Sequence, residues 1–206
     1  MKIKVCGLKY KDNLNEVASL NPDYIGFIHY SRSGRYMAET LTKEDLKNIS
    51  SVKTAVFVNP TLTEITKSIQ LFGYNALQFH GNESPDLCES FRSDSMKVIK
   101  AFSVNDEFNF NFIKDYHGKC DYFLFDTKGK EEGGNGFSFN WNILKQYDQK
   151  TPFFLSGGIG TDNIHQVMEL TELNIYGIDI NSKVESEVGV KDISKVKEVI
   201  KIIREN

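Results

Sequence analysis

Short runs of β-branched and aromatic residues recur along the chain, each about five or six residues long, which is the usual length of a strand. Within most runs, apolar residues occupy successive positions rather than alternate ones. This pattern is typical of strands that are covered on both faces, as in parallel sheets. Eight strands are predicted, over Lys2–Cys6, Tyr24–His29, Thr54–Val58, Ala76–His80, Lys97–Phe102, Tyr122–Asp126, Phe153–Ser156 and Ile175–Ile180.

Helix-like segments with recognisable start signals lie between most of these runs. A capping Ser, Thr or Asp, sometimes followed three residues later by an acidic residue, precedes a helical spacing of apolar positions. The segment 105–116, with Asn and Phe interleaved, predicts a loop or a short irregular helix. The predicted starts are Asp12, Thr42 with Asp45, Thr61 with Glu64 (a helix ending at Gly73), Ser84 followed by Pro85, Thr161 and Asp192.

The alternation of eight strands with helical or loop connections predicts an α/β fold of the (β/α)8 TIM-barrel type, in preference to an open Rossmann sheet. The length of 206 residues is close to the lower size limit of such a barrel, roughly 200 residues. We therefore expect residues 1–206 to form one domain. The glycine-rich segment between 127 and 140 is interpreted as a mobile loop rather than a domain boundary.

Composition narrows the classes of partner and the cellular compartment. A net charge of −3 gives no general attraction to nucleic acid or to an anionic membrane, and no apolar run has the length of a membrane span. The three cysteines, Cys6, Cys88 and Cys120, are far apart and lack CxxC spacing, so neither a disulfide framework nor a zinc site is expected. A reducing cytoplasm fits this pattern.

In a barrel of this type the active site lies at the carboxyl ends of the strands. Two groups suited to proton transfer end strands that face each other: the thiol of Cys6 on the first strand and the carboxyl of Asp126 on the sixth. A thiol acts as a base only as thiolate, which calls for a partly exposed, electropositive position. The strand ends carry Cys6, His29–Arg35, Asn59, His80, Phe102, Asp126, Gly157-Gly158 and Asp179–Ser182.

The ends of the seventh and eighth strands predict a phosphate site. Gly157 and Gly158 allow backbone N–H groups to approach an anion closely. Asn181 and Ser182 follow the eighth strand and precede an expected extra turn of helix. In many barrels a phosphate lies between these two loops, at the N-terminus of such a short helix.

Several blocks together resemble the phosphoribosylanthranilate isomerase family, in the order in which that family has them. They cover residues 4 to 192, nearly the whole chain. The blocks are Lys4-Val5-Cys6-Gly7-Leu8, Tyr24–Phe27, Ser31–Tyr36, Val56–Asn59, Leu77–Pro85, Gly133–Gly136, Ser156–Gly158, Asp179–Glu185 and Gly189–Asp192.

The resemblance implies an Amadori rearrangement of N-(5'-phosphoribosyl)anthranilate that needs neither a metal nor an organic cofactor. It implies that Asp126 protonates the ring oxygen and opens the furanose to a Schiff base. Cys6 then removes the proton from C2, and the resulting enolamine tautomerises to the ketone. It further implies that Arg35 pairs with the anthranilate carboxylate, that His80 and Asp179 line the substrate pocket, and that Gly157, Gly158, Asn181 and Ser182 bind phosphate. The expected partner is a small phosphosugar substrate, and the chain is expected to be a monomer or a homodimer.

This sequence departs from the family pattern at a few places. Gly34 stands where a proline usually precedes the arginine, and Asn181 replaces a usual serine. Lys183 stands where glycine is common, so it either contacts the phosphate or faces solvent. None of these departures involves Cys6 or Asp126.

Two other interpretations predict different behaviour. Another phosphosugar barrel enzyme, an indole-glycerol-phosphate synthase or a ribulose-phosphate epimerase, would share the phosphate end. The synthase would call for lysine and glutamate at early strand ends and the epimerase for metal-binding histidines, and neither pattern is present. A catalytically silent barrel would bind a phosphometabolite without turnover, but it would leave the joint presence of Cys6, Asp126 and Arg35 without a role.

Overall fold

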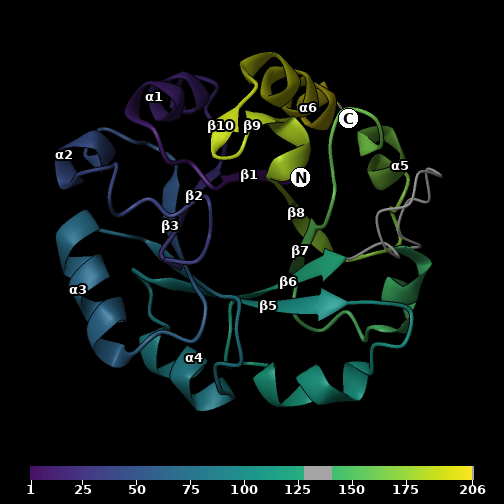
Figure 1. Ribbon diagram of the computed structural model, residues 1–206. Coiled ribbons are helices and arrows are strands. Elements are labelled where there is room, and N and C mark those ends of the chain that lie inside the picture. The colour runs from purple at the N-terminus through teal and green to yellow at the C-terminus, as the bar shows by residue number, and fades with distance from the viewer. Residues whose placement is uncertain (128–140, 206) are drawn as a thin grey trace.

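Eight parallel strands close into a barrel in the computed structural model, which describes residues 1–127 and 141–205. Each strand pairs with the next along the chain, and β8 pairs back onto β1, so that Lys4 lies beside Asp179. Figure 1 shows the strands as a ring with the helices arranged outside it. This closed sheet confirms the predicted (β/α)8 architecture. The glycine-rich segment expected between 127 and 140 lies outside the described residues, apart from Thr127 at the end of β6.

The eight predicted strands are all present, and their bounds shift by only one or two residues. The largest differences are at β3, which starts two residues earlier than predicted, and at β5, which ends two residues later. The strands are β1 Lys2–Cys6, β2 Tyr24–Ile28, β3 Val52–Phe57, β4 Ala76–Phe79, β5 Lys97–Val104, β6 Tyr122–Thr127, β7 Phe153–Ser156 and β8 Ile175–Ile180.

The connections are helical, and several are short. A two-stranded antiparallel hairpin after β8, which the sequence did not predict, joins Glu185–Glu187 (β9) to Val190–Lys191 (β10). The helices are α1 Lys11–Ser19, α2 Lys43–Leu46, α3 Leu62–Phe72, α4 Pro85–Phe91, α5 Ile164–Met168 and α6 Ile193–Glu205, with 3-10 turns η1 Phe110–Tyr116, η2 Trp141–Gln146 and η3 Ser182–Val184.

The predicted helix starts were correct where a side chain accepts hydrogen bonds from the N–H groups of the first helical turn. Thr61 and Glu64 form a reciprocal capping box, and α3 ends at Gly73 in the left-handed conformation. The hydroxyl of Ser84 accepts from the backbone N–H of Leu87, and Asp192 accepts from the N–H groups at the start of α6.

Two predicted starts are wrong. Helix α1 begins at Lys11, one residue before Asp12, because the N–H of Leu14 already donates to the carbonyl of Tyr10. Helix α5 begins after Asn163 rather than at Thr161, and the side-chain oxygen of Asn163 accepts from the N–H of Gly160. In both places the residue at the N-cap position, Tyr10 or Asn163, makes no side-chain hydrogen bond to the first turn of its helix.

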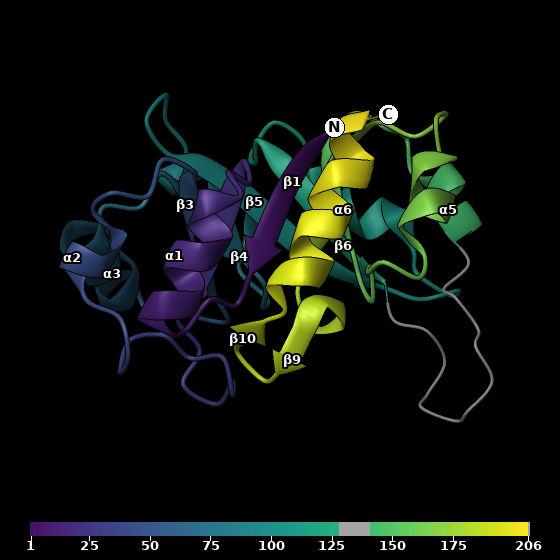
Figure 2. The ribbon, with the colours of Figure 1, turned by 90° about the horizontal axis from the view of Figure 1, so that it is seen from above.

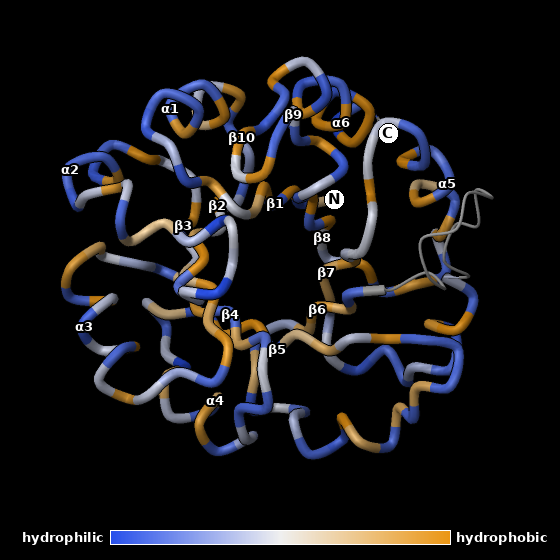
Figure 3. Tube along the Cα trace, viewed as in Figure 1, coloured by the Kyte–Doolittle hydropathy of each residue, from blue (hydrophilic) through white to orange (hydrophobic). Residues whose placement is uncertain are grey.

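The apolar residues pack in two layers. The larger cluster fills the space between the outside of the barrel and the helices, and Figure 3 shows this alternation of apolar and polar positions along the helices. A smaller cluster fills the inside of the barrel, with Tyr24, Ile99, Ala101, Leu124 and Phe154. Successive side chains of a strand point to opposite faces, so every second strand residue faces the interior. None of the helices in the described part of the chain is both long and apolar enough to cross a membrane.

The two ends of the barrel differ in what they carry. Figure 2 shows both chain termini at the end where β1 begins, and the β9–β10 hairpin at the end toward which β1 points. The second of these is the carboxyl end of the strands. It is the end where the loops that carry the predicted site residues emerge.

Candidate functional site

A cavity of about 230 Å³ opens at the carboxyl ends of the strands. All the residues to which the sequence gave a role in catalysis or binding line it, whereas the strand-end residues His29, Asn59 and Phe102 do not. The lining residues are Cys6, Ile28, Arg35, Val56, Gln78, His80, Asp126, Ser156, Gly157, Gly158, Ile159, Asp179, Asn181, Ser182 and Lys183.

Cys6 is the last residue of β1 and lies at the floor of this cavity. Its side chain is buried, with 3% of the residue exposed, so the expectation of a partly exposed thiol was wrong. Removal from water raises the pKa of the Cys6 thiol, and the charge of Asp179 adds to this effect. The ammonium groups of Lys4 and Lys191 oppose it. The electropositive part of the expectation is therefore met by two lysines, while the sulfur is far less hydrated than expected.

Asp126 is held on the opposite wall by a short chain of polar contacts. Its Oδ2 lies 3.5 Å from Nε2 of His80, and the other ring nitrogen of His80 lies 3.1 Å from the side-chain nitrogen of Gln78. An amide N–H of Gln78 that donates to Nδ1 leaves the ring proton on Nε2, where it faces the carboxylate. Gln78 and His80 are two residues apart, so both side chains face the interior. His80 thus contacts Asp126 as well as the cavity.

Asp179, predicted to line the substrate pocket, forms a buried ion pair with Lys4. Lys4 Nζ lies 2.8 Å from Asp179 Oδ1, and neither residue has appreciable exposure. Burial disfavours the ammonium of Lys4, but Asp179 and Cys6 outweigh this effect and raise its pKa. The sequence analysis missed Lys4. Strand alternation was a signal for it, because a residue two before Cys6 faces the same side.

Arg35 reaches the cavity from the loop after β2 and is engaged by Glu185. Its Nε donates to Oε1 of Glu185 at 2.8 Å, and a terminal nitrogen donates to Oε2 at 2.5 Å. Lys191 Nζ also donates to Oε1 of Glu185 at 2.7 Å and to the side-chain oxygen of Asn181 at 2.7 Å. Burial disfavours the charge on Glu185, but hydrogen bonds from Arg35 and Lys191 outweigh it and lower its pKa. Sequence reasoning assigned no role to Glu185 or Lys191.

The predicted phosphate residues lie at one side of the cavity. Gly157 and Gly158 have φ values of 99° and 70°, a backbone conformation that side chains other than glycine rarely adopt. Ser182 opens η3, the extra turn expected after β8, which is only three residues long. Lys183 lines the same cavity and is also exposed to solvent.

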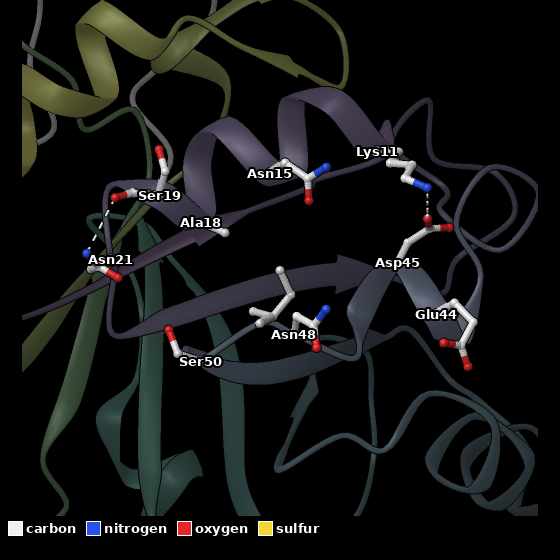
Figure 4. Close-up of a pocket in the computed structure, with 10 residues that line it drawn as sticks. Lys11, Asn15, Ala18, Ser19, Asn21, Glu44, Asp45, Asn48 and Ser50 are labelled. Atoms are coloured by element: carbon white, nitrogen blue, oxygen red, sulfur yellow. Dashed lines mark hydrogen bonds and ion pairs between the residues drawn. The ribbon is translucent and has the colours of Figure 1, made fainter.

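Other parts of the described structure are less suited to catalysis than this cavity. In the described ranges, no three His, Cys, Asp or Glu side chains are grouped as a metal site would need. A second, open hollow lies on the outside of the barrel between α1 and α2. Figure 4 shows the Lys11–Asp45 ion pair spanning one end of it and mostly short polar side chains along its walls. The Asp45 carboxylate there is engaged by Lys11 and by the capping residue Thr42.

Comparisons with known proteins identify the family of this chain. The family model for N-(5'phosphoribosyl)anthranilate (PRA) isomerase matches residues 3–202. The chain is 40% identical to an N-(5'-phosphoribosyl)anthranilate isomerase of Parabacteroides distasonis, over 98% of this chain and 93% of the relative. It is 36% identical to the corresponding protein of Staphylococcus haemolyticus, over 99% of both.

Solved structures agree with these matches. The crystal structure of phosphoribosyl anthranilate isomerase from Thermotoga maritima superposes with a TM-score of 0.84 at 28% identity and covers all of both chains. A phosphoribosyl anthranilate isomerase in complex with reduced 1-(o-carboxyphenylamino)-1-deoxyribulose 5-phosphate superposes with a TM-score of 0.82 at 26% identity, again over all of both chains.

Proposed function

We propose that two side chains, Asp126 and Cys6, carry out the proton transfers of the reaction. The chain belongs to the family of N-(5'-phosphoribosyl)anthranilate isomerases. The family match confirms the resemblance noted in the sequence. The protein is an isomerase that converts N-(5'-phosphoribosyl)anthranilate into 1-(2-carboxyphenylamino)-1-deoxyribulose 5-phosphate, an Amadori rearrangement in tryptophan biosynthesis. The proposal concerns which residues carry it out.

Asp126 is the acid of this mechanism. Its carboxyl protonates the ring oxygen of the sugar, and the furanose opens to a Schiff base. The observation that carries the proposal is the placement of Asp126 and Cys6 as facing groups in one cavity, on β6 and β1. The contact between Asp126 and Nε2 of His80 supports the assignment, because a neighbouring ring N–H stabilises the carboxylate left after proton transfer.

Cys6 is the base of the second step. Its thiolate removes the proton from C2 of the opened sugar, while the protonated Schiff base accepts the electron pair. The enolamine formed in this way then tautomerises to the ketone. The Schiff base within the substrate supplies the electron sink, and the chain's own contribution is to position the thiolate and the carboxyl on either side of the sugar.

The remaining site residues hold the two ends of the substrate. Arg35 binds the anthranilate carboxylate, for which the planar guanidinium fork is well shaped. Gly157, Gly158, Asn181 and Ser182 bind the phosphate, and His80 and Asp179 border the sugar between them. Support comes from their arrangement around one cavity, with Arg35 on the β2 loop and the glycines after β7.

We also propose that residues 1–206 form a single domain that works in the cytoplasm as a monomer or a homodimer. The three cysteines are free, which suits a reducing compartment. One similar protein, from Thermotoga maritima, is described as a dimeric phosphoribosylanthranilate isomerase.

Turnover of freshly prepared N-(5'-phosphoribosyl)anthranilate, followed by the loss of its fluorescence, tests the assignment. We expect Cys6→Ser and Asp126→Asn each to lower kcat by at least about a hundredfold, since positioned proton transfer typically contributes 10²–10⁴-fold. A serine hydroxyl is far too weak an acid to supply the anion near neutral pH. Cys88→Ala, at a buried cysteine outside the cavity, is the matched control and should keep its activity. Activity of Cys6→Ser within a few-fold of the unchanged protein would remove Cys6 from the mechanism.

A further inference from the structure

Lys4 is an unusual residue for the inside of a barrel. It lies two positions before Cys6 on β1, so both side chains point into the interior. It is completely buried, with 0% exposure, although a buried ammonium is costly unless it is paired. Interior barrel positions are ordinarily filled by bulky apolar residues, which would pack here at no electrostatic cost. The lysine therefore calls for an explanation beyond packing.

Gly26 brings Lys4 and Cys6 together, because its lack of a side chain lets both pack against it. It is the register partner of Cys6 on β2 and faces the same interior. A Cβ atom at this position would lie 2.6 Å from Sγ of Cys6 and 3.1 Å from Nζ of Lys4. The sulfur and the ammonium thus both pack directly against Gly26 and lie close to each other there. A methyl group at position 26 would overlap the sulfur.

Charged groups face the Cys6 sulfur from several elements. Lys4 lies on the same strand as Cys6, and Asp179 lies on β8. Lys191 on β10 and Arg35 on the loop after β2 also face the sulfur, and both pair with Glu185. His80 and Asp126 face it across the cavity. Burial is the largest influence on the Cys6 pKa and raises it; of the surrounding charges, Lys4 has the largest effect and lowers it. Lys4 also favours the thiolate by hydrogen bonding.

We propose that Lys4 is a positioning residue for Cys6, and that its ammonium, packed with the sulfur against Gly26, favours the thiolate form of that buried sulfur. This inference deepens the proposed function and rests on Cys6 as the base of the reaction. The ionisation of the thiol is nevertheless measurable without substrate. Lys4 contacts no atom of the substrate in this scheme; it acts through Cys6.

The simpler view is that Lys4 and Asp179 form only a structural ion pair. The two views predict different directions for the change in the Cys6 pKa when one partner of the pair is removed. Lys4→Met and Asp179→Asn break the same 2.8 Å contact, so a purely structural role predicts similar consequences for Cys6. If charge acts on the sulfur, loss of the ammonium raises the thiol pKa, whereas loss of the carboxylate lowers it.

The experiment uses a full-length form in which Cys88 and Cys120 are replaced by alanine, so that Cys6 is the only thiol. The thiolate is titrated by its absorbance at about 240 nm and by its rate of alkylation with iodoacetamide. We expect Lys4→Met to raise the thiol pKa by about one unit or more and Asp179→Asn to lower it. Lys4→Arg, which keeps the positive charge, should stay closer to the parent form than Lys4→Met.

A pKa that moves in the same direction in both variants, or in neither, would overturn the proposal. Lys4→Met leaves the Asp179 carboxylate buried without its partner and is the variant at risk of not folding. In that event the double variant Lys4→Met/Asp179→Asn, which carries neither charge, is compared with Asp179→Asn alone. The proposal then requires a higher thiol pKa in the double variant, and equal values would refute it.

Turnover separates this inference from the assignment of Cys6 as base. If Cys6 is the base, the pH at which kcat/KM rises should move upward in Lys4→Met together with the thiol pKa. A thiol pKa that responds to Lys4 while the pH profile of kcat/KM stays fixed would support the action of Lys4 on the thiol. The same result would contradict the catalytic role of Cys6.

Discussion

Arg35 and Glu185 form a two-bonded ion pair at the rim of the cavity, with nitrogen–oxygen distances of 2.8 and 2.5 Å. The guanidinium that we assign to the substrate carboxylate is thus already oriented by a protein carboxylate. Lys191 holds the same Glu185 at 2.7 Å, so Glu185 keeps a cationic partner if the fork of Arg35 turns toward a substrate. Arg35 is positioned for a carboxylate without being needed to neutralise Glu185.

Replacement of Arg35 should therefore affect binding more than chemistry. The anthranilate carboxylate is present before and during the reaction, and an interaction that is equal in both states raises KM when it is lost and leaves kcat nearly unchanged. We expect Arg35→Ala to raise KM at least tenfold, as is usual for a charge-assisted hydrogen bond of about 1.5–3 kcal/mol. The KM of Arg35→Lys, which keeps the charge but loses the fork, should lie between that of Arg35→Ala and that of the unchanged protein. A large drop in kcat with KM unaltered would show that the carboxylate assignment is wrong.

The pH dependence of kcat/KM should follow Cys6. Burial raises the pKa of this thiol, so at neutral pH the thiol is mainly protonated and the base is present as a minor species. Since the thiolate fraction grows as pH approaches the pKa from below, kcat/KM should rise steadily from about pH 6 to about pH 9. The profile is measured at several salt concentrations. A flat profile across this range would mean that a group with a much lower pKa is the base.

Inorganic phosphate should occupy the site between Gly157-Gly158 and Asn181-Ser182. Backbone donors and a short turn converge there, and the net charge of −3 works against non-specific uptake of anions. Phosphate is therefore expected to inhibit competitively and to raise Tm by binding only the folded protein. Both effects should disappear in Gly158→Asp, which places a carboxylate at the site.

A second glycine provides the matched control for this variant. Gly118 has a φ of 77°, close to the 70° of Gly158, and a Cβ added at Gly118 would meet nothing within 4 Å. Gly118→Asp thus imposes a similar backbone strain and the same change in charge away from the cavity. It should keep both phosphate effects. Equal inhibition by phosphate in the two variants would place the anion elsewhere.

His29 should make the fold less stable in acid. Burial lowers its pKa to about 4, below the ordinary 6.5, and Nε2 lies 2.7 Å from the hydroxyl of Tyr74. Between these two values the unfolded chain binds the proton more readily than the folded protein does, so the stabilisation is complete above pH 6.5 and is lost as pH falls toward 4. The loss amounts to roughly 3 kcal/mol at most.

Urea unfolding measures this effect. The free energy of unfolding should fall more steeply between about pH 7 and about pH 5 in the unchanged protein than in His29→Gln, which has no titrating ring. The difference between the two proteins removes the contribution of other titrating groups. Parallel curves would show that His29 carries no part of the acid sensitivity.

The sequence alone determined the order and type of the elements, because these depend on interactions over a few residues. Runs of buried apolar residues predicted the eight strands, and the Thr61–Glu64 box and Gly73 placed both ends of α3. The strand ends pointed to Cys6 and Asp126, and both residues line the cavity. Local signals misplaced the starts of α1 and α5 and did not indicate the β9–β10 hairpin.

Tertiary structure decided which charges meet. Lys4 and Asp179 are 175 residues apart, and Arg35 and Glu185 are 150 apart, so no local pattern relates them. They come together because β8 pairs with β1 and closes the barrel, which also places the β9–β10 hairpin beside the β2 loop. The burial of Cys6 follows from the same closure, and burial rather than residue type sets the strength of electrostatic effects on its sulfur. The sequence could name the thiol, but only the closed barrel determined its surroundings.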